Sequence, residues 1–182
     1  MNILQMEGKK LMKKSKIFAK IIDFFRNGCY TGFTERGDSM ANVFDVAKYI
    51  LEKEGSMSTM KLQKLCYYCQ AWSLVWDDKA LFDEEFEAWA NGPVCRPLFY
   101  KTQGQYSVSA DDETGESNNL APYQIETIDA VLAHYAPHNA QWLSQLTHME
   151  DPWNRARVGI PTGVGCDRII TKESMAEYYG GL

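Results

Sequence analysis

The 182-residue chain lacks an uninterrupted hydrophobic run of any length near its start. The most apolar stretch there, IFAKIIDFF at residues 17–25, is broken by Lys20 and Asp23, and no small-residue cleavage site follows it. A secretory signal needs both features, so this segment does not qualify as one. The stretch is also too short to cross a bilayer. We therefore expect neither a membrane anchor nor a membrane partner.

Paired cysteines are lacking as well. The chain has five cysteines, an odd number, and no secretory segment accompanies them. Extracellular disulfide frameworks normally use an even number of cysteines in an oxidising compartment. We therefore expect free thiols, no disulfide bonds and a cytoplasmic location.

A metal-binding set of side chains is also missing. Cys66 and Cys69 form the one C-x-x-C motif, but helical spacing places both on the same face as Leu62 and Leu65. On such a face cysteine behaves as a small hydrophobic residue. The three histidines, at 134, 138 and 148, and the remaining cysteines are scattered, so no second ligand pair has metal-site spacing. We predict that both thiols lie in the core and that the protein has no metal and no cofactor.

Charge is divided unevenly along the chain. Residues 1–39 contain eight basic and four acidic side chains, whereas residues 40–182 contain eleven and twenty, a formal net charge of −9. An acidic body repels phosphate backbones, which argues against a nucleic-acid partner. It suits a basic protein partner better.

The division in charge also suggests a division in structure. Residues 9–27 have the spacing of a basic amphipathic helix, and residues 28–39 are rich in Gly and Thr, which is typical of a linker. Residues 1–39 are either a native extension or a segment upstream of a natural start at Met40. The second alternative is suggested by residues 35–38, which can be encoded by purine-rich codons resembling a ribosome-binding site.

Apolar periodicity and capping residues predict the elements of the body. We expect helices at 42–54, 59–76, 98–100, 122–135, 139–149 and 171–179, a last turn at 151–156, and a strand at 81–90. Residues 107–110 offer a marginal strand inside a mobile loop at 105–120, and residues 158–167 form a Gly/Pro-rich loop. The predicted fold class is mostly α (α+β), a compact helical domain with a small β-hairpin or sheet.

The segment Lys61–Val94 carries the most specific pattern in the chain. It reads KLQKLCYYCQAW, then LFDEEFEAW, then GPV. This order resembles the Panacea-domain antitoxin family, the SocA-like and phage-associated GepA-like proteins. The resemblance extends from Met40 to about Tyr179. Cys95 and Arg96 depart from it, because small or polar residues usually follow the G-P-V there.

The resemblance implies a cytoplasmic antitoxin, often encoded beside its toxin or in a prophage, that neutralises the toxin by direct binding. In the SocA-like branch the bound toxin is handed to a host protease, with the domain acting as an adaptor. Two alternatives remain. One is a phage or mobile-element protein that binds and inhibits a host defence or regulatory factor, and the other is a thiol enzyme built on Cys66 or Cys95. No orienting group for such a thiol is visible, so we expect no enzymatic activity.

Candidate residues for partner binding lie in the same segment. The carboxylates at 83–87 alternate between two faces of the predicted strand, which favours an acidic edge for a basic partner over acid–base catalysis. Trp89 stands beside a Gly-Pro turn. We predict partner contacts at Lys61, Tyr67, Glu84, Glu87 and Trp89, and a structural motif of Leu62, Leu65, Trp72, Gly92, Pro93 and Trp153. Lys61, Gln63, Lys64 and Gln70 form a polar helix face, either solvated or in contact with a partner, and Trp153 is expected to pack against the first helices.

Overall fold

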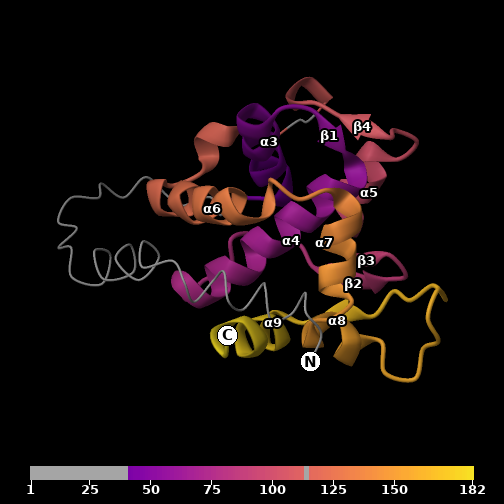
Figure 1. The fold of residues 1–182 in the computed structure, drawn as a ribbon. Coiled ribbons are helices and arrows are strands. Elements are labelled where there is room, and N and C mark those ends of the chain that lie inside the picture. Colours follow the sequence, from indigo (N-terminus) through magenta and orange to yellow (C-terminus); the bar gives the residue numbers. More distant parts are fainter. Residues whose placement is uncertain (1–40, 113–114) are drawn as a thin grey trace. The chain divides into compact units, whose positions relative to one another are not determined.

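Helix α4 (Thr59–Trp76) runs through the middle of the described part of the chain, residues 41–112 and 115–182 of this computed structural model (Figure 1). Helices α3 (Val43–Glu54) and α6 (Pro122–Tyr135) lie on one side of it, and α9 (Lys172–Gly180) lies on the other. The predicted basic helix, linker and alternative start fall in residues 1–40, outside the described residues.

The other helices and the strands are short. The remaining helices are α5 (Arg96–Thr102), α7 (Ala140–Thr147) and α8 (Asp151–Ala156). The strands are β1 (Met57–Ser58), β2 (Phe86–Trp89), β3 (Gly92–Cys95), β4 (Ser107–Val108) and β5 (Ile169–Ile170). Two single 3-10 turns, Ala110–Asp112 and Ser117–Asn119, lie in the predicted 105–120 loop.

Polar side chains cap the first turns of α3, α4 and α9. The Asn42 side chain accepts hydrogen bonds from the N–H groups of Phe44 and Asp45, and the Asp45 carboxylate accepts one from the Asn42 N–H. Ser58 and Thr171 accept the corresponding bonds at α4 and α9. These side chains satisfy backbone donors that a helix leaves free at its first turn.

Helix α4 is buried on all sides and not along one stripe. Every residue from Leu62 to Ser73 is buried, including the polar ones, because α3, α6, α7, α9 and β3 all pack against it. An amphipathic surface helix would expose its polar face. The polar residues of α4 therefore need partners inside the protein.

The strands form two small antiparallel sheets. In one, β2 lies between β3 and β5, with Phe86 opposite Cys95 on one side and Ile170 on the other. In the other, β1 pairs with β4. The predicted strand at 81–90 is shorter than expected, and residues 107–110 do not join it. The fold class is mostly α with a small sheet, as predicted.

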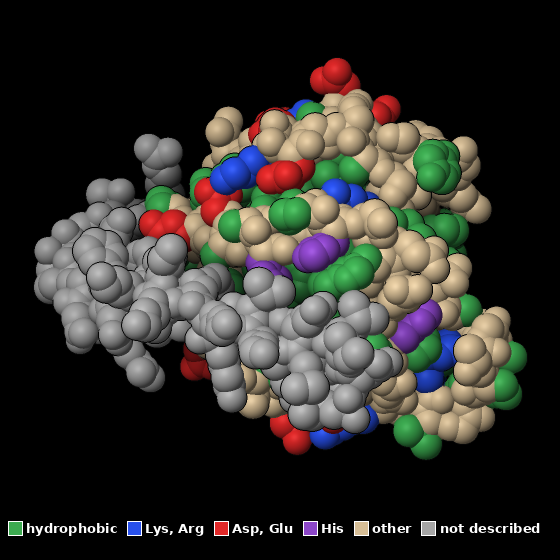
Figure 2. Space-filling view, viewed as in Figure 1, with side chains coloured by type: hydrophobic (Ala, Val, Ile, Leu, Met, Phe, Trp, Pro, Cys, Tyr) green, Lys and Arg blue, Asp and Glu red, His purple; other side chains and the backbone are tan. Residues whose placement is uncertain are grey.

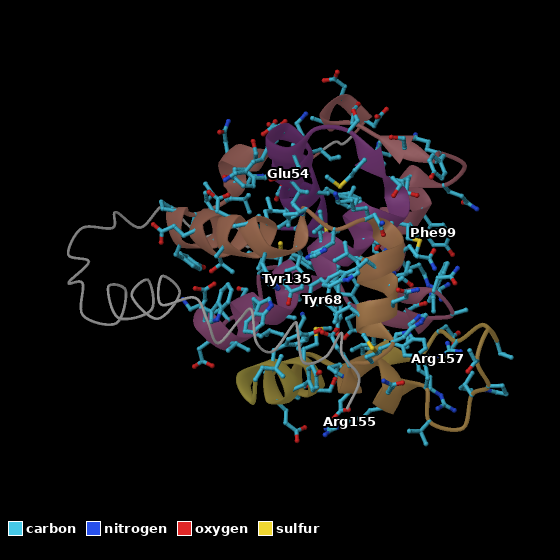
Figure 3. All side chains as sticks on the ribbon, in the orientation of Figure 1. Glu54, Tyr68, Phe99, Tyr135, Arg155 and Arg157 are labelled. Carbon is cyan, nitrogen blue, oxygen red and sulfur yellow. The ribbon has the colours of Figure 1, made fainter. Side chains whose placement is uncertain are left out.

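Aromatic side chains from α4, α6 and α9 fill the centre of the core. The rings of Tyr68 and Tyr135 stack at 4.0 Å (Figure 3), and Tyr179 meets Tyr67 and Tyr68 edge-on. The buried Glu150 carboxylate accepts hydrogen bonds from the hydroxyls of Tyr68 (3.0 Å) and Tyr179 (2.7 Å). Burial raises the pKa of Glu150 to about 8.

Candidate partner-binding surface

Two glutamines of α4 hold the backbone of the β2–β3 hairpin and of the segment that leads into it. Gln63 donates to the Cys95 carbonyl (3.2 Å) and accepts from the Cys95 N–H (2.8 Å). Gln70 accepts from the N–H groups of Leu81 and Phe82 and donates to the Phe82 carbonyl. The predicted polar face of α4 is therefore neither solvated nor open to a partner at these two positions. The two glutamines supply buried hydrogen bonds to the backbone of residues 81, 82 and 95.

Lys64 continues this inner contact. Its ammonium donates to the Pro93 carbonyl at 2.9 Å, and the residue is only 1% exposed. Burial lowers the pKa of Lys64 to about 7. Gly92 has φ +100, and a Cβ there would lie 2.7 Å from Thr147 Oγ1 and 2.8 Å from Lys64 Cε. The hairpin turn reaches α4 this closely because position 92 has no side chain.

The outer side of the hairpin carries a different set of contacts. Glu87 on β2 receives two hydrogen bonds of 2.6 Å from Arg96, one from Nε and one from Nη2. The Trp89 indole N–H donates to the same carboxylate at 2.8 Å. The bonds from Arg96 hold the pKa of Glu87 below its usual value. Glu87 thus orients both a guanidinium and an indole.

An aromatic row extends this outer side onto α5. The Trp89 ring meets Phe99 edge-on at 4.7 Å, and Phe99 lies 5.9 Å from Tyr100. Figure 3 labels Phe99 at the edge of the fold beside the hairpin. Tyr100 is 58% exposed, and its hydroxyl lies 3.5 Å from Arg96 Nη1. Exposed, fixed aromatic rings of this kind are frequent anchors in protein interfaces.

The loop at 157–168 lies next to the hairpin and is tied down by two arginines. Arg157 (Figure 3) donates to the carbonyls of Ala88, Pro161 and Val164. Arg168 donates to the carbonyl of Val158. Val158 and Val164 stay exposed, and Figure 2 shows hydrophobic side chains at the lower right, where this loop lies in Figure 1.

A pocket of about 540 Å³ opens between the hairpin and this loop. One wall is formed by residues 89–91 and Arg96, and the other by Gly165, Cys166 and Asp167. The two walls are more than 60 residues apart in the sequence, but β5 follows the loop and pairs with β2, which brings them together. The pocket, the aromatic row and the exposed loop form one surface, which we call the hairpin face.

Trp153 supports the hairpin face from below. Its indole N–H donates to the Trp89 carbonyl at 2.9 Å, and its ring stacks on His148 and lies under the Arg157 guanidinium. We predicted contacts with the first helices, whereas these contacts are with the hairpin and the arginine of the loop. Burial, with Lys64 and Arg157 nearby, lowers the pKa of His148.

The structure distributes the predicted partner residues over several places. Glu87 and Trp89 lie together on the hairpin face. Glu84 is half-buried and accepts from the Val43 N–H at the start of α3 (3.1 Å). Lys61 is half-buried and donates to the Ala136 carbonyl at 2.7 Å.

The prediction that Tyr67 contacts a partner is wrong. The residue has no exposed surface, because its ring is enclosed by Tyr68, Phe86 and Tyr179. It cannot reach a partner in this structure. Leu62, Leu65, Trp72 and Pro93 of the predicted structural motif are buried as well.

The thiols of the C-x-x-C motif lie in the core. Cys66 and Cys69 have no exposed surface, and burial raises the pKa of Cys69. Burial also raises the pKa of Cys95, to about 12. Reactive cysteines show the opposite shift. Within residues 41–112 and 115–182, no group of three or more His, Cys, Asp or Glu side chains is arranged to hold a metal ion.

The hairpin and the α4 residues that hold it lie inside a segment that matches a known family. Residues 62–154, just over half of the chain, match the model of the antitoxin SocA-like, Panacea domain. The chain belongs to this family. The Panacea match includes Gln63, Lys64 and the whole hairpin, and it ends before the 157–168 loop. The chain matches no curated protein and no solved structure.

The hairpin face extends beyond the segment that matches the Panacea domain. Its pocket residues Gly165, Cys166 and Asp167 follow the end of the match. Arg96 and Asp167 were not among the predicted site residues. The departure of Arg96 from the family pattern was the one sequence signal for it. Among the described helices, none is long and apolar enough to cross a membrane.

Proposed function

We propose that this chain is the antitoxin of a toxin–antitoxin pair, and that it neutralises a toxin protein by direct, non-enzymatic binding through the hairpin face. The observation that carries the proposal is Trp89, a half-buried indole held in place by Glu87 and Phe99 beside an open pocket, in a Panacea domain. A ring fixed before binding loses little conformational freedom in a complex.

The composition of the hairpin face supports a protein partner. Fixed aromatic side chains lie at its centre, the exposed valines 158 and 164 extend it, and the charged residues Arg96 and Asp167 border it. Protein interfaces combine an aromatic and apolar centre with a polar rim in this way. The acidic body, with a net charge of −9, would attract a basic toxin and speed its association.

The buried thiols support a binding protein over a thiol enzyme. Burial raises the pKa values of Cys69 and Cys95, which disfavours the nucleophilic thiolate at neutral pH. Replacing Cys95 with Ser would leave neutralisation intact if binding is the whole activity.

Co-expression with the neighbouring gene tests the proposal. A gene product that stops growth alone, and permits growth with this chain, would be the toxin. The Trp89→Ala variant should lose the rescue, while Tyr106→Ala, which removes an 86% exposed ring on the loop before β4, should keep it. A neighbouring gene that is harmless alone, or a toxic one that this chain leaves toxic, would refute the antitoxin assignment.

The level of the toxin then separates two modes of neutralisation. An antitoxin that blocks the toxin leaves it abundant in a complex. An adaptor that delivers it to a protease shortens its half-life. We favour blocking, because blocking requires only the hairpin face. Delivery to a protease would require a second surface that binds the protease.

A further inference from the structure

The pocket of the hairpin face contains a carboxylate that is not in an ion pair within the described part of the chain. Asp167 is exposed and lines the pocket, and it forms no ion pair with any residue in the ranges 41–112 and 115–182. Arg96 also lines the pocket, but its guanidinium is engaged by both oxygens of Glu87. Arg96 is thus paired with a carboxylate, whereas Asp167 is in no ion pair with another described residue.

The indole of Trp89 adds a second feature that attracts cations. Its N–H donates to Glu87 and its ring meets Phe99, so two contacts restrict the ring at the pocket wall. The face of an indole carries negative electrostatic potential and attracts a cation that lies over it. A pocket with both an aromatic face and a carboxylate suits a planar cation, which can stack and form two hydrogen bonds at once.

We infer that this pocket accepts an arginine side chain of the protein partner, with the guanidinium stacked on Trp89 and hydrogen-bonded to Asp167. The inference rests on the proposed function only in that the toxin supplies the arginine. It goes further by naming the chemical group that is recognised and by assigning a binding role to Asp167. The pocket volume of about 540 Å³ is ample for one such side chain.

A peptide titration tests the pocket without the toxin. The full chain is labelled with ¹⁵N, and the indole N–H signal of Trp89 is identified by its absence in Trp89→Phe. Acetyl-Gly-Arg-Gly-amide is then compared with the same peptide containing Gln or Glu in place of Arg. The arginine peptide should shift the Trp89 signal in a saturable way, and the other two should not.

Substitution of the carboxylate makes the titration specific. Asp167→Asn should weaken binding of the arginine peptide by about fivefold, as expected for loss of one charge contact near the surface. Glu126→Gln, on the exposed side of α6, removes an equal charge away from the pocket and should leave the affinity unchanged. Equal shifts with the glutamate peptide, no saturable shift with the arginine peptide, or unchanged affinity in Asp167→Asn would each overturn the inference.

The two proposals fail separately. If the arginine peptide binds as described but no neighbouring gene product is neutralised, the antitoxin assignment fails and the arginine pocket stands. If neutralisation is observed but the peptide does not bind, the toxin is recognised in another way and the arginine pocket is refuted.

Discussion

The two sides of the β2–β3 hairpin use polar side chains in different ways. On the inner side, Gln63 and Lys64 of α4 are buried and bond to the hairpin backbone, and Gln70 holds the backbone of Leu81 and Phe82 just before the hairpin. On the outer side, Glu87 bonds to the side chains of Arg96 and Trp89, next to an open pocket. Hydrogen bonds to the backbone fix the position of the hairpin. Hydrogen bonds between side chains fix the orientation of the side chains on its outer surface. The inner side should therefore control stability, and the outer side should control binding.

The largest effect is expected where the inner contact is closest. Gly92→Ala would place a Cβ against Thr147 and Lys64 at a positive φ, and we expect a loss of about 4 kcal/mol in the free energy of unfolding. Gly104→Ala is the matched control, since φ is +85 and no atom lies within 4 Å of its Cβ. It should cost about 1 kcal/mol. Urea denaturation measures both, and equal losses would contradict the close approach.

Loss of the Gln70 side chain should have the next largest effect. Gln70→Ala leaves the N–H groups of Leu81 and Phe82 and the Phe82 carbonyl without this partner in a buried site. We expect a loss of about 3 kcal/mol. Gln141→Ala, on the exposed side of α7, should change stability by less than about 0.5 kcal/mol. A similar result for the two variants would show that the hydrogen bonds from Gln70 to Leu81 and Phe82 do not stabilise the fold.

The buried lysine should make stability depend on pH. The pKa of Lys64 is about 7 in the folded protein and near 10.5 in the unfolded chain, so the unfolded chain binds more protons between these values. Stability from this group is therefore fully present above about pH 10.5 and is lost progressively as the pH falls from there to about 7. Relative to Lys64→Met, the wild-type protein should gain about 2 kcal/mol from pH 7 to pH 9. Parallel curves for the two proteins would contradict the burial of the Lys64 amine.

The smallest effects on stability are expected on the outer side. Asp167→Asn and Tyr100→Ala change exposed side chains, and each should alter the free energy of unfolding by less than about 0.5 kcal/mol. Both should nevertheless weaken binding of the toxin. A large loss of stability in either variant would mean that the outer side also holds the fold together.

The helices could be predicted because their signals are local. Asn42, Ser58 and Thr171 cap helices within a few residues of themselves, so spacing and residue type were sufficient. Strand β5 was missed because two residues carry no periodicity, and it forms only through its partner β2.

The site was harder to predict because its contacts join residues that are far apart in the sequence. The partner of Gln63 lies 32 residues away, so a polar residue at a helical position gives no sign that it is buried. Tyr67 was assigned to a surface that α9 covers from 112 residues further along the chain. Arg96 and Asp167 line the same pocket only because β5 pairs with β2 and brings the loop to the hairpin. Glu87 and Trp89 were expected to lie close together because both stand on one short strand beside a Gly-Pro turn, and both are on β2.

The most direct test of the account is the affinity of the purified chain for its toxin, measured by calorimetry for Trp89→Ala and Tyr106→Ala beside the wild-type protein. Trp89→Ala should weaken binding by about 30-fold or more, as for an interface anchor, while Tyr106→Ala binds as the wild type does. Wild-type affinity in a folded Trp89→Ala variant would contradict the assignment of the hairpin face as the surface that binds the toxin.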